Sequence, residues 1–108
     1  MTTPYSSTTW IVKWGLEEEF VQRWEEFADW SSAQGLTAGA MLLRDTDERN
    51  RFVSFGPWES IDAIRRWRSL PGFQERVSRL HEVLERFEPH TLELVGETRG
   101  RRGWRRQA

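Results

Sequence analysis

The feature that most constrains the fold is the order in which two kinds of apolar repeat follow one another. Strand-like segments rich in β-branched and aromatic residues occur at 8–14, 37–44, 51–58 and 90–95. Helical spacing of apolar residues occurs over 16–34, 59–70 and 73–87, and Pro71-Gly72 separates the last two segments. The order predicts an α+β protein, a ferredoxin-like βαββαβ fold with helices on one face of an antiparallel sheet.

Chain length and end composition predict one domain. The 108 residues are the size of a single domain, which we place at 8–97. Residues 1–7 are expected to be a flexible N-terminus. Residues 98–108, TRGRRGWRRQA, are expected to be an Arg/Gly-rich flexible tail.

Charge and composition argue against several classes of function. The tail carries five Arg, which leaves 11 basic against 17 acidic side chains, a net charge of −6, in the rest of the chain. An acidic body argues against nucleic-acid binding by the domain. The chain has no Cys, only two His and no metal-binding motif, so no metal site is expected. No apolar run predicts a membrane span, and the start lacks the pattern of a secretory signal, so a cytoplasmic protein is expected.

The aromatic content and the expected sheet together predict a dimer. Seven Trp in so short a chain suit a core, a subunit interface or the wall of a cavity for a flat ligand. In the third strand, Phe52 lies on one face, whereas Val53 and Phe55 lie on the other. Helices cover only one face of this fold, so we expect a second copy to cover the other. The expected partner is a homodimer through the sheet faces.

Three segments in order resemble the antibiotic biosynthesis monooxygenase family. They are W-x-V-K-x-G-x-E-x-x-F at 10–20, RFVSFGPWES at 51–60 and W-R-x-x-P-x-F at 67–73, and the resemblance runs from about Thr8 to Glu97. It implies a dimeric α/β barrel of two βαββαβ subunits, each with a cavity between sheet and helices. It also implies a cofactor-free role in secondary metabolism.

Two branches of this family can be compared residue by residue. The quinone-forming monooxygenases resemble the chain at Trp58, but they carry Asn where this chain has Ser54. The haem-degrading branch has a helical Trp, matched by Trp67, and a haem-ligating His at the position of Val77. It also has an Asn on the first strand, where TTWIVKW has none. The resemblance therefore does not extend to haem degradation, and no cofactor is expected.

The candidate site residues follow from these comparisons and from chemistry. His81 is the candidate general base, because an imidazole can take up a proton near neutral pH. Ser54 is the candidate oxygen-binding donor. The candidate substrate-binding residues, each of which core packing or solvation would also explain, are Trp58, Trp67, Phe55 and Arg76.

Three hypotheses stay open for the function, and whether the chain is an enzyme stays open with them. The first is a cofactor-independent monooxygenase acting on a small aromatic or polyketide-like substrate, which His81 deprotonates and which then reduces O2. The second is a cyclase or isomerase that uses the same pocket without O2. The third is a noncatalytic dimeric module that binds an aromatic ligand. Oxygen uptake separates the first hypothesis from the other two.

Overall fold

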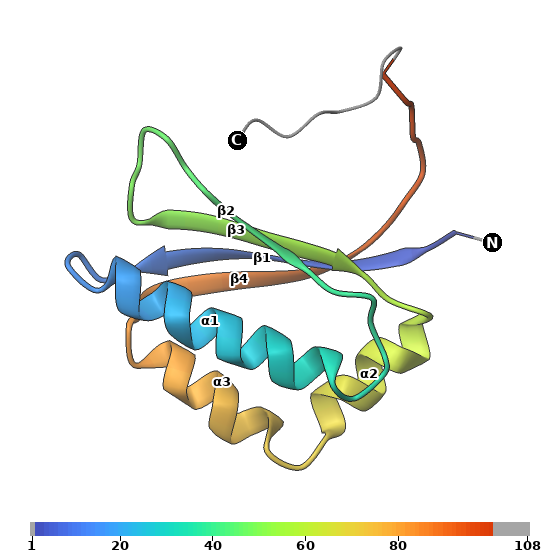
Figure 1. Cartoon of the computed structure of the whole chain (residues 1–108), viewed down its shortest axis with the longest axis horizontal. Helices are drawn as coiled ribbons and strands as arrows, with labels where there is room; N and C mark the ends of the chain where they lie inside the picture. The colour runs from blue at the N-terminus through green and yellow to red at the C-terminus, as the bar shows by residue number, and fades with distance from the viewer. Residues whose placement is uncertain (1, 101–108) are drawn as a thin grey trace.

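One antiparallel sheet carries all the helices of the described chain on one face (Figure 1). The computed structural model describes residues 2–100. Its elements are β1 Pro4–Val12, α1 Glu17–Ser32, β2 Met41–Arg44, β3 Arg51–Pro57, α2 Ile61–Ser69, α3 Phe73–His81 and β4 Leu84–Glu93. The strand order is β2-β3-β1-β4. The structure confirms the α+β ferredoxin-like prediction, with the second helix broken into α2 and α3.

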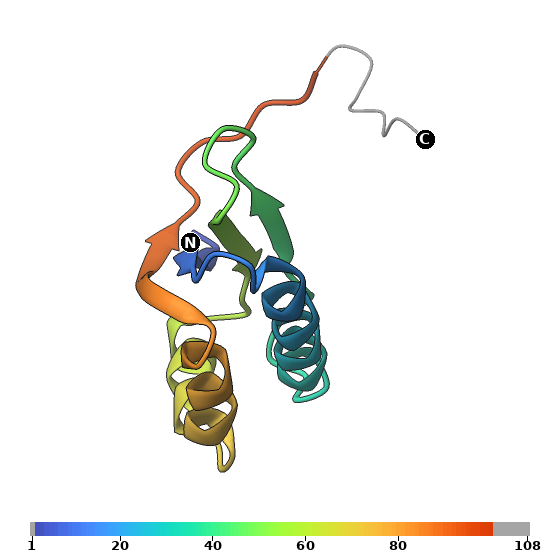
Figure 2. The same ribbon diagram turned by 90° about the vertical axis from the view of Figure 1, so that its left-hand side faces the viewer.

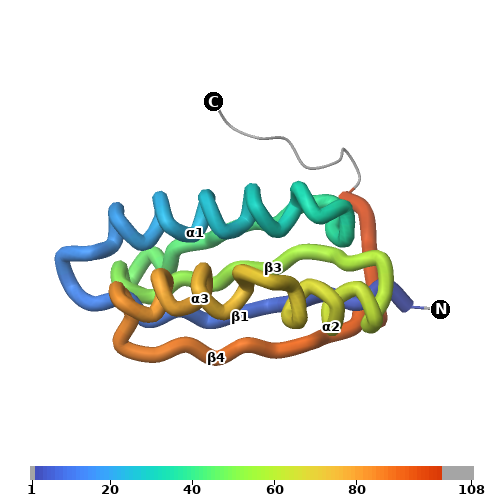
Figure 3. Tube along the Cα trace, turned by 90° about the horizontal axis from the view of Figure 1, so that it is seen from below, coloured from blue at the N-terminus to red at the C-terminus, as the bar shows by residue number. Residues whose placement is uncertain are grey.

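The helices form a single layer beneath the sheet. Seen from the end, α1 makes one column, and α2 with α3 makes a second (Figure 2). Seen from below, α2 and α3 follow each other along a line beside α1 (Figure 3). The break between them lies at Pro71-Gly72, as the sequence predicts. The space between the two columns and the sheet is therefore the interior of the domain.

The boundary between α3 and β4 differs from the prediction. The helix predicted over 73–87 ends at His81, and β4 begins at Leu84 rather than at 90. The apolar spacing that suggested a longer helix instead serves strand pairing, since Leu84 pairs with Val12 and Phe87 with Trp10. Pro89 lies within β4. A proline is tolerated there because β4 is an edge strand.

The ends of the chain also differ from the prediction in part. β1 begins at Pro4, so residues 4–7, expected to be flexible, pair with β3 on one side and β4 on the other. Polar Ser6 and Ser7 masked this strand start in the sequence. Residues 98–100 have no regular secondary structure. The rest of the predicted tail, 101–108, lies outside the described residues.

Side chains on the helix-facing side of the sheet become smaller along its length. Paired residues of β1, β3 and β4 form three rows across this face. The first row is large, the second small and the third smallest: Trp10–Phe52–Phe87, Thr8–Ser54–Pro89 and Ser6–Gly56–Thr91. The buried residues of α1 show the same trend, from the rings of Phe20, Trp24 and Phe27 to Ser31.

The end of the interior at the large row is closely packed. Its fully buried side chains include Val12, Phe20, Phe52, Leu80 and Val83. The ring centroids of Phe20 and Phe52 lie 5.0 Å apart, within the range of favourable aromatic contact. Most of the hydrophobic burial that stabilises the domain comes from this cluster.

Asn50 and Asp45 close the packed end beside the β2–β3 turn. Buried Asn50 donates from its side-chain Nδ2 to the Val12 carbonyl at 3.0 Å, and the backbone carbonyl of Asn50 accepts the Val12 N–H at 2.8 Å. In the turn, the backbone N–H groups of Glu48 and Asp47 bond to the Asp45 carboxylate and lower its pKa, with a smaller contribution from Arg51. These bonds fix the turn without apolar contacts.

The opposite face of the sheet carries apolar side chains without helices over them. Strand pairing places Met41 with Phe55, and Leu43 with Val53, on this face. Met41 and Leu43 are about half exposed, at 57% and 52%. We refer to the face formed by these four residues and Leu92 as the open face. A contiguous exposed apolar surface of this kind usually marks an interface.

Candidate functional site

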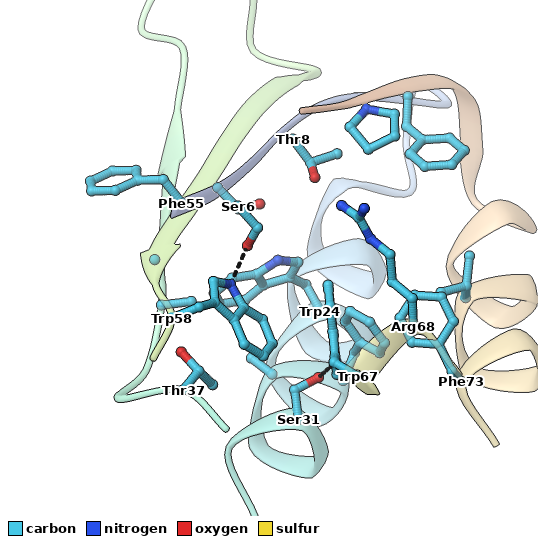
Figure 4. Close-up of a pocket in the computed structure, with 18 of the residues that line it drawn as sticks. Ser6, Thr8, Trp24, Ser31, Thr37, Phe55, Trp58, Trp67, Arg68 and Phe73 are labelled. Atoms are coloured by element: carbon cyan, nitrogen blue, oxygen red, sulfur yellow. Dashed lines mark hydrogen bonds between the residues drawn. The ribbon is translucent and has the colours of Figure 1, made fainter. Parts of the chain in front are cut away.

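The decrease in side-chain size along these rows leaves a cavity of about 490 Å³ between sheet and helices. It lies where the two small rows face Ala28 and Ser31 of α1 and Trp67 of α2 (Figure 4). A volume of roughly 300–1,000 Å³ is typical of small-molecule pockets. Among the residues that line the cavity, eight are Trp or Phe and seven are Ser or Thr.

Each of three indole N–H groups around the cavity donates to a serine hydroxyl. The pairs are Trp10–Ser54 at 2.9 Å, Trp58–Ser6 at 2.8 Å and Trp67–Ser31 at 2.8 Å. Two of them are drawn as dashed lines in Figure 4. Every pair joins residues far apart in the sequence, so the bonds also connect β1 with β3 and α1 with α2. All three serines line the cavity.

These bonds determine what the serines can offer a ligand. A hydroxyl carries one proton to donate and lone pairs to accept. Because each serine oxygen already accepts an indole N–H, its own proton remains available to an acceptor in the cavity. No side-chain bond donated by Ser6, Ser31 or Ser54 is found among the described residues. The serines are therefore suited to donate hydrogen bonds to carbonyl or phenolate oxygens.

Trp58 and Trp67 form the aromatic wall at the end of β3. Their ring centroids lie 4.6 Å apart, and Trp58 is only 5% exposed. The Gly-Pro turn ends β3 at Pro57, and Ser60 then caps α2 by accepting the Ala63 N–H at 3.0 Å. Both rings are thus packed into the domain and also border the cavity, so the packing and ligand-contact interpretations apply together.

His81 lies at the other end of the cavity wall. It is the last residue of α3, and its ring packs edge-on against Phe87, with centroids 4.5 Å apart. The residue is exposed, and no hydrogen bond of its side chain is found within residues 2–100. Phe87 in turn stacks on Trp10, which bonds to Ser54. His81 and Ser54 therefore border one cavity, as their predicted roles require.

Two predicted substrate-binding residues are placed differently from the prediction. Phe55 borders the cavity, but its ring points away in Figure 4, because it alternates with the inward Ser54 along β3. Arg76, expected at the cavity mouth, lies outside this cavity. Its guanidinium sits 4.8 Å above the Trp30 ring, on the side of α3 that faces α1. The α3 residues that border the cavity are Phe73, Gln74, Val77 and His81.

The groove around Arg76 is a separate, polar surface. It is bordered by charged residues of α1 and α3 and by Phe27. Arg23 there donates to Glu82 at 2.8 Å, and this bond raises the pKa of Arg23. The Nε atom of Arg76 is buried without a hydrogen-bond partner in the described chain. The stacked guanidinium therefore contributes to helix packing rather than to the cavity.

Sequence analysis missed Arg68 and two of the serines. Arg68 extends from the last turn of α2 into the cavity, next to Trp67 in the sequence (Figure 4). Ser31 gave a usable signal, since a hydroxyl at a core position of the α1 stripe must find a partner. Ser6 gave none, because β1 was expected to start after it.

Metal and membrane features were also checked on the described part of the chain. Residues 2–100 contain no group of three or more His, Asp or Glu arranged to hold a metal ion. None of their helices is both long and apolar enough to cross a bilayer.

Comparison with known proteins gives one family match. The family model described as antibiotic biosynthesis monooxygenase matches residues 7–79, about two thirds of the chain. No curated protein matches the chain.

Solved structures give the same fold. SnoaB, a cofactor-independent oxygenase from Streptomyces nogalater, superposes with a TM-score of 0.81 at 23% identity, covering 91% of this chain and 97% of that one. A putative antibiotic biosynthesis monooxygenase from Bordetella bronchiseptica gives 0.78 at 18% identity, covering 88% and 99%. Rv0793 from Mycobacterium tuberculosis gives 0.75 at 14% identity, covering 88% and 97%. At these identities the likeness establishes the fold alone.

Proposed function

Since the chain belongs to the antibiotic biosynthesis monooxygenase family, we propose that it is a cofactor-independent oxygenase of secondary metabolism. Its substrate is a small aromatic or polyketide-like molecule with a phenolic ring. The observation that carries this proposal is that His81 and Ser54 border the same aromatic cavity. That cavity can accept a fused-ring molecule. The chain is also similar in fold to SnoaB, a cofactor-independent oxygenase, which supports the same chemistry.

The proposed reaction begins with proton transfer to His81. The imidazole removes a proton from the substrate, leaving a phenolate conjugated with a ring CH group. This electron-rich anion passes one electron to O2, and the resulting radical pair forms a carbon–oxygen bond. The proton on the carbon that bears the peroxide moves to the outer peroxide oxygen as the O–O bond breaks, giving a ring carbonyl and hydroxide. Hydroxide takes the proton back from His81 and leaves as water. A phenol O–H, a ring C–H and O2 thus become the two carbonyls of a quinone and H2O without an external reductant.

The cavity residues have distinct roles in this scheme. Trp58 and Trp67 hold the flat ring by contact with its face and edge. Ser54, with its oxygen bonded to the Trp10 N–H, donates its own proton to the developing oxyanion or peroxide. Donors fixed in advance are worth more than flexible ones because no reorganisation is needed during the reaction.

A homodimer through the open face is part of the proposal. Phe55 and Val53 alternate with the cavity-facing Ser54 on the same strand. Covering them with a second copy would make the sheet rigid directly behind the cavity. Replacing Leu43 by Glu should convert the dimer to a monomer in analytical ultracentrifugation, because it buries a charge at the interface. The control is Trp14→Glu, at an exposed position in the β1–α1 turn; a dimer in the Leu43 variant would contradict the proposed interface.

A noncatalytic binding module is the second candidate. It is favoured by the absence, within residues 2–100, of a hydrogen bond that orients His81. Catalytic imidazoles are usually held by such a bond. A cyclase or isomerase that needs no O2 uses the same groups and differs only in the fate of the substrate anion.

Oxygen uptake with a panel of naphthols and hydroxyanthracenes tests the proposal. We expect uptake coupled to formation of a carbonyl product with some panel members. His81→Ala should lower that rate by about 100-fold or more, the usual range for loss of a general base. The control is Ser78→Ala, at an exposed position on α3. Unchanged turnover in the His81 variant would remove its role. Binding of the phenols without O2 uptake or conversion would favour the noncatalytic module. Conversion of a phenol without O2 uptake would favour the cyclase or isomerase.

A further inference from the structure

The charges around the cavity are unlike those of the rest of the chain. The protein has 17 acidic residues, yet no Asp or Glu of the described chain borders this cavity. The ionisable residues that do border it are Arg68, His81 and His90. His90 alternates with the inward Pro89 and Thr91 along β4, so its side chain points to the open face. A cavity with cationic groups and no carboxylates attracts anionic ligands, whereas a cationic ligand would find no counterion there.

Arg68 has most of its donors available. Its Nη2 lies 3.5 Å from the Thr91 hydroxyl, which is the outer limit of a hydrogen bond. It forms no ion pair with any residue of the described chain, whereas Arg65, one turn earlier on α2, pairs with Asp62. In Figure 4 its guanidinium points from the helices towards the strands, across the cavity. A planar guanidinium in this position can receive a carboxylate in bidentate geometry.

Three serine hydroxyls of the wall have the same preference. The hydroxyls of Ser6, Ser31 and Ser54 already accept indole N–H groups, so each is left to donate. Thr37 donates its hydroxyl proton to the Pro57 carbonyl at 2.6 Å and is not available. The cavity therefore presents hydrogen-bond donors on several sides, and the guanidinium of Arg68 lies at the edge formed by α2 and β4.

We propose that the cavity takes an aromatic carboxylate, with the carboxylate held by Arg68 beside Thr91 and the ring against Trp58 and Trp67. This inference rests on the proposed function in using the same cavity, and it adds the charge of the substrate and the residue that selects it. Arg68 is a specificity-determining residue. It contacts the end of the ligand remote from the oxygen that reacts.

Binding of a matched pair of probes tests the proposal on the full chain. 2-Naphthoate and 2-naphthamide have the same ring and nearly the same shape, but only the first is charged. We expect isothermal titration calorimetry to give at least about tenfold tighter binding of the naphthoate, as charged hydrogen bonds are worth roughly 1.5–3 kcal/mol. The preference should fall as salt is raised, because the pair is partly exposed.

Two variants identify the residue responsible. Arg68→Gln should bring the affinity for the naphthoate down to that for the naphthamide. Arg66→Gln removes the same charge from an exposed position of α2 outside the cavity, and it should keep the tenfold preference. Equal binding of both probes by the unchanged protein would overturn the proposal. So would no binding of the naphthoate at millimolar concentration, an undiminished preference in Arg68→Gln, or an equal loss in both variants.

The outcome can be separated from that of the proposed function. Oxygen uptake from uncharged naphthols without any carboxylate preference would overturn this inference and leave the oxygenase proposal standing. A carboxylate preference that depends on Arg68, without oxygen uptake from any phenol, would uphold the inference and remove the oxygenase proposal.

Discussion

The two ends of the interior are built from the same strands and helices but differ in how they are filled. At one end, Trp10 and Phe52 meet rings of α1, and little space remains. At the other end, Ser6 and Gly56 occupy the corresponding sheet positions, and a cavity of about 490 Å³ remains. The comparison shows how one fold provides for both stability and binding. Large side chains at one end of the rows pack together and stabilise the domain, and small side chains at the other end leave space for a ligand.

The same comparison explains the hydrogen bonds. At the packed end, ring contacts hold the layers together. At the cavity end, the small residues of the sheet make few such contacts, although the rings of Trp58, Trp67 and Phe73 pack on one another. Three Trp–Ser bonds also connect the elements there. Directional bonds can hold walls apart, whereas apolar packing stabilises only surfaces that touch. The predictions below test this division between the two ends.

The largest effect is expected from Phe52→Ala at the packed end. Removing this buried ring should lower the free energy of unfolding by about 3–5 kcal/mol, measured by urea denaturation at a fixed protein concentration. Its neighbour Val53, on the open face, provides the matched control, and Val53→Ala should cost clearly less. Equal losses in the two variants would mean that the helix-covered face is not the main source of stability.

A smaller effect is expected from Gly56→Ala at the cavity end. An added Cβ would collide with the Gly39 carbonyl oxygen, so the segment before β2 must move. We expect a loss of about 2 kcal/mol in the free energy of unfolding, typical of overpacking. Gly96→Ala is the control, because an added Cβ there meets nothing within 4 Å. An unchanged stability of the Gly56 variant would show that the close contact between β3 and the segment before β2 is easily relaxed.

A third prediction concerns the bond between Trp58 and Ser6. A double-mutant cycle with Trp58→Phe and Ser6→Ala should give a coupling of about 1 kcal/mol in the free energy of unfolding. The coupling exists because each single change leaves one polar group at the cavity wall without its partner. Additive losses would mean that the 2.8 Å bond does not help to hold the cavity walls.

The smallest effect on stability is expected from Thr8→Leu. Thr8 lies in the second row and borders the cavity, where a larger side chain finds space. The free energy of unfolding should change by no more than about 1 kcal/mol, the scale of one buried methylene. Titration with 2-naphthoate should nevertheless show strongly weakened binding. A loss of stability as large as that of Phe52→Ala would contradict the division between a filled end and a hollow end.

The sequence by itself determined the elements and their order. The period of apolar residues identified all three helical segments, and the Pro71-Gly72 break was visible before the structure. Alternation in RFVSFGPW also separated Phe52 from Val53 and Phe55, whereas the structure shows that Phe52 and Ser54 lie on the covered side. Local periodicity is sufficient for these features because it depends only on neighbours in the chain. It failed at 84–87, where the same apolar residues suit a helix or a strand.

Only the tertiary structure decided the site. Whether Thr8 lies beside Ser54 and Pro89 depends on register between strands that are distant in sequence, and no local pattern encodes it. The pairing of Trp10 with Ser54, and the choice of Arg68 rather than Arg76 at the cavity, follow from how the helices sit on that register. Periodicity assigns a residue to a face, but the neighbours across the interior are fixed by packing of the whole chain.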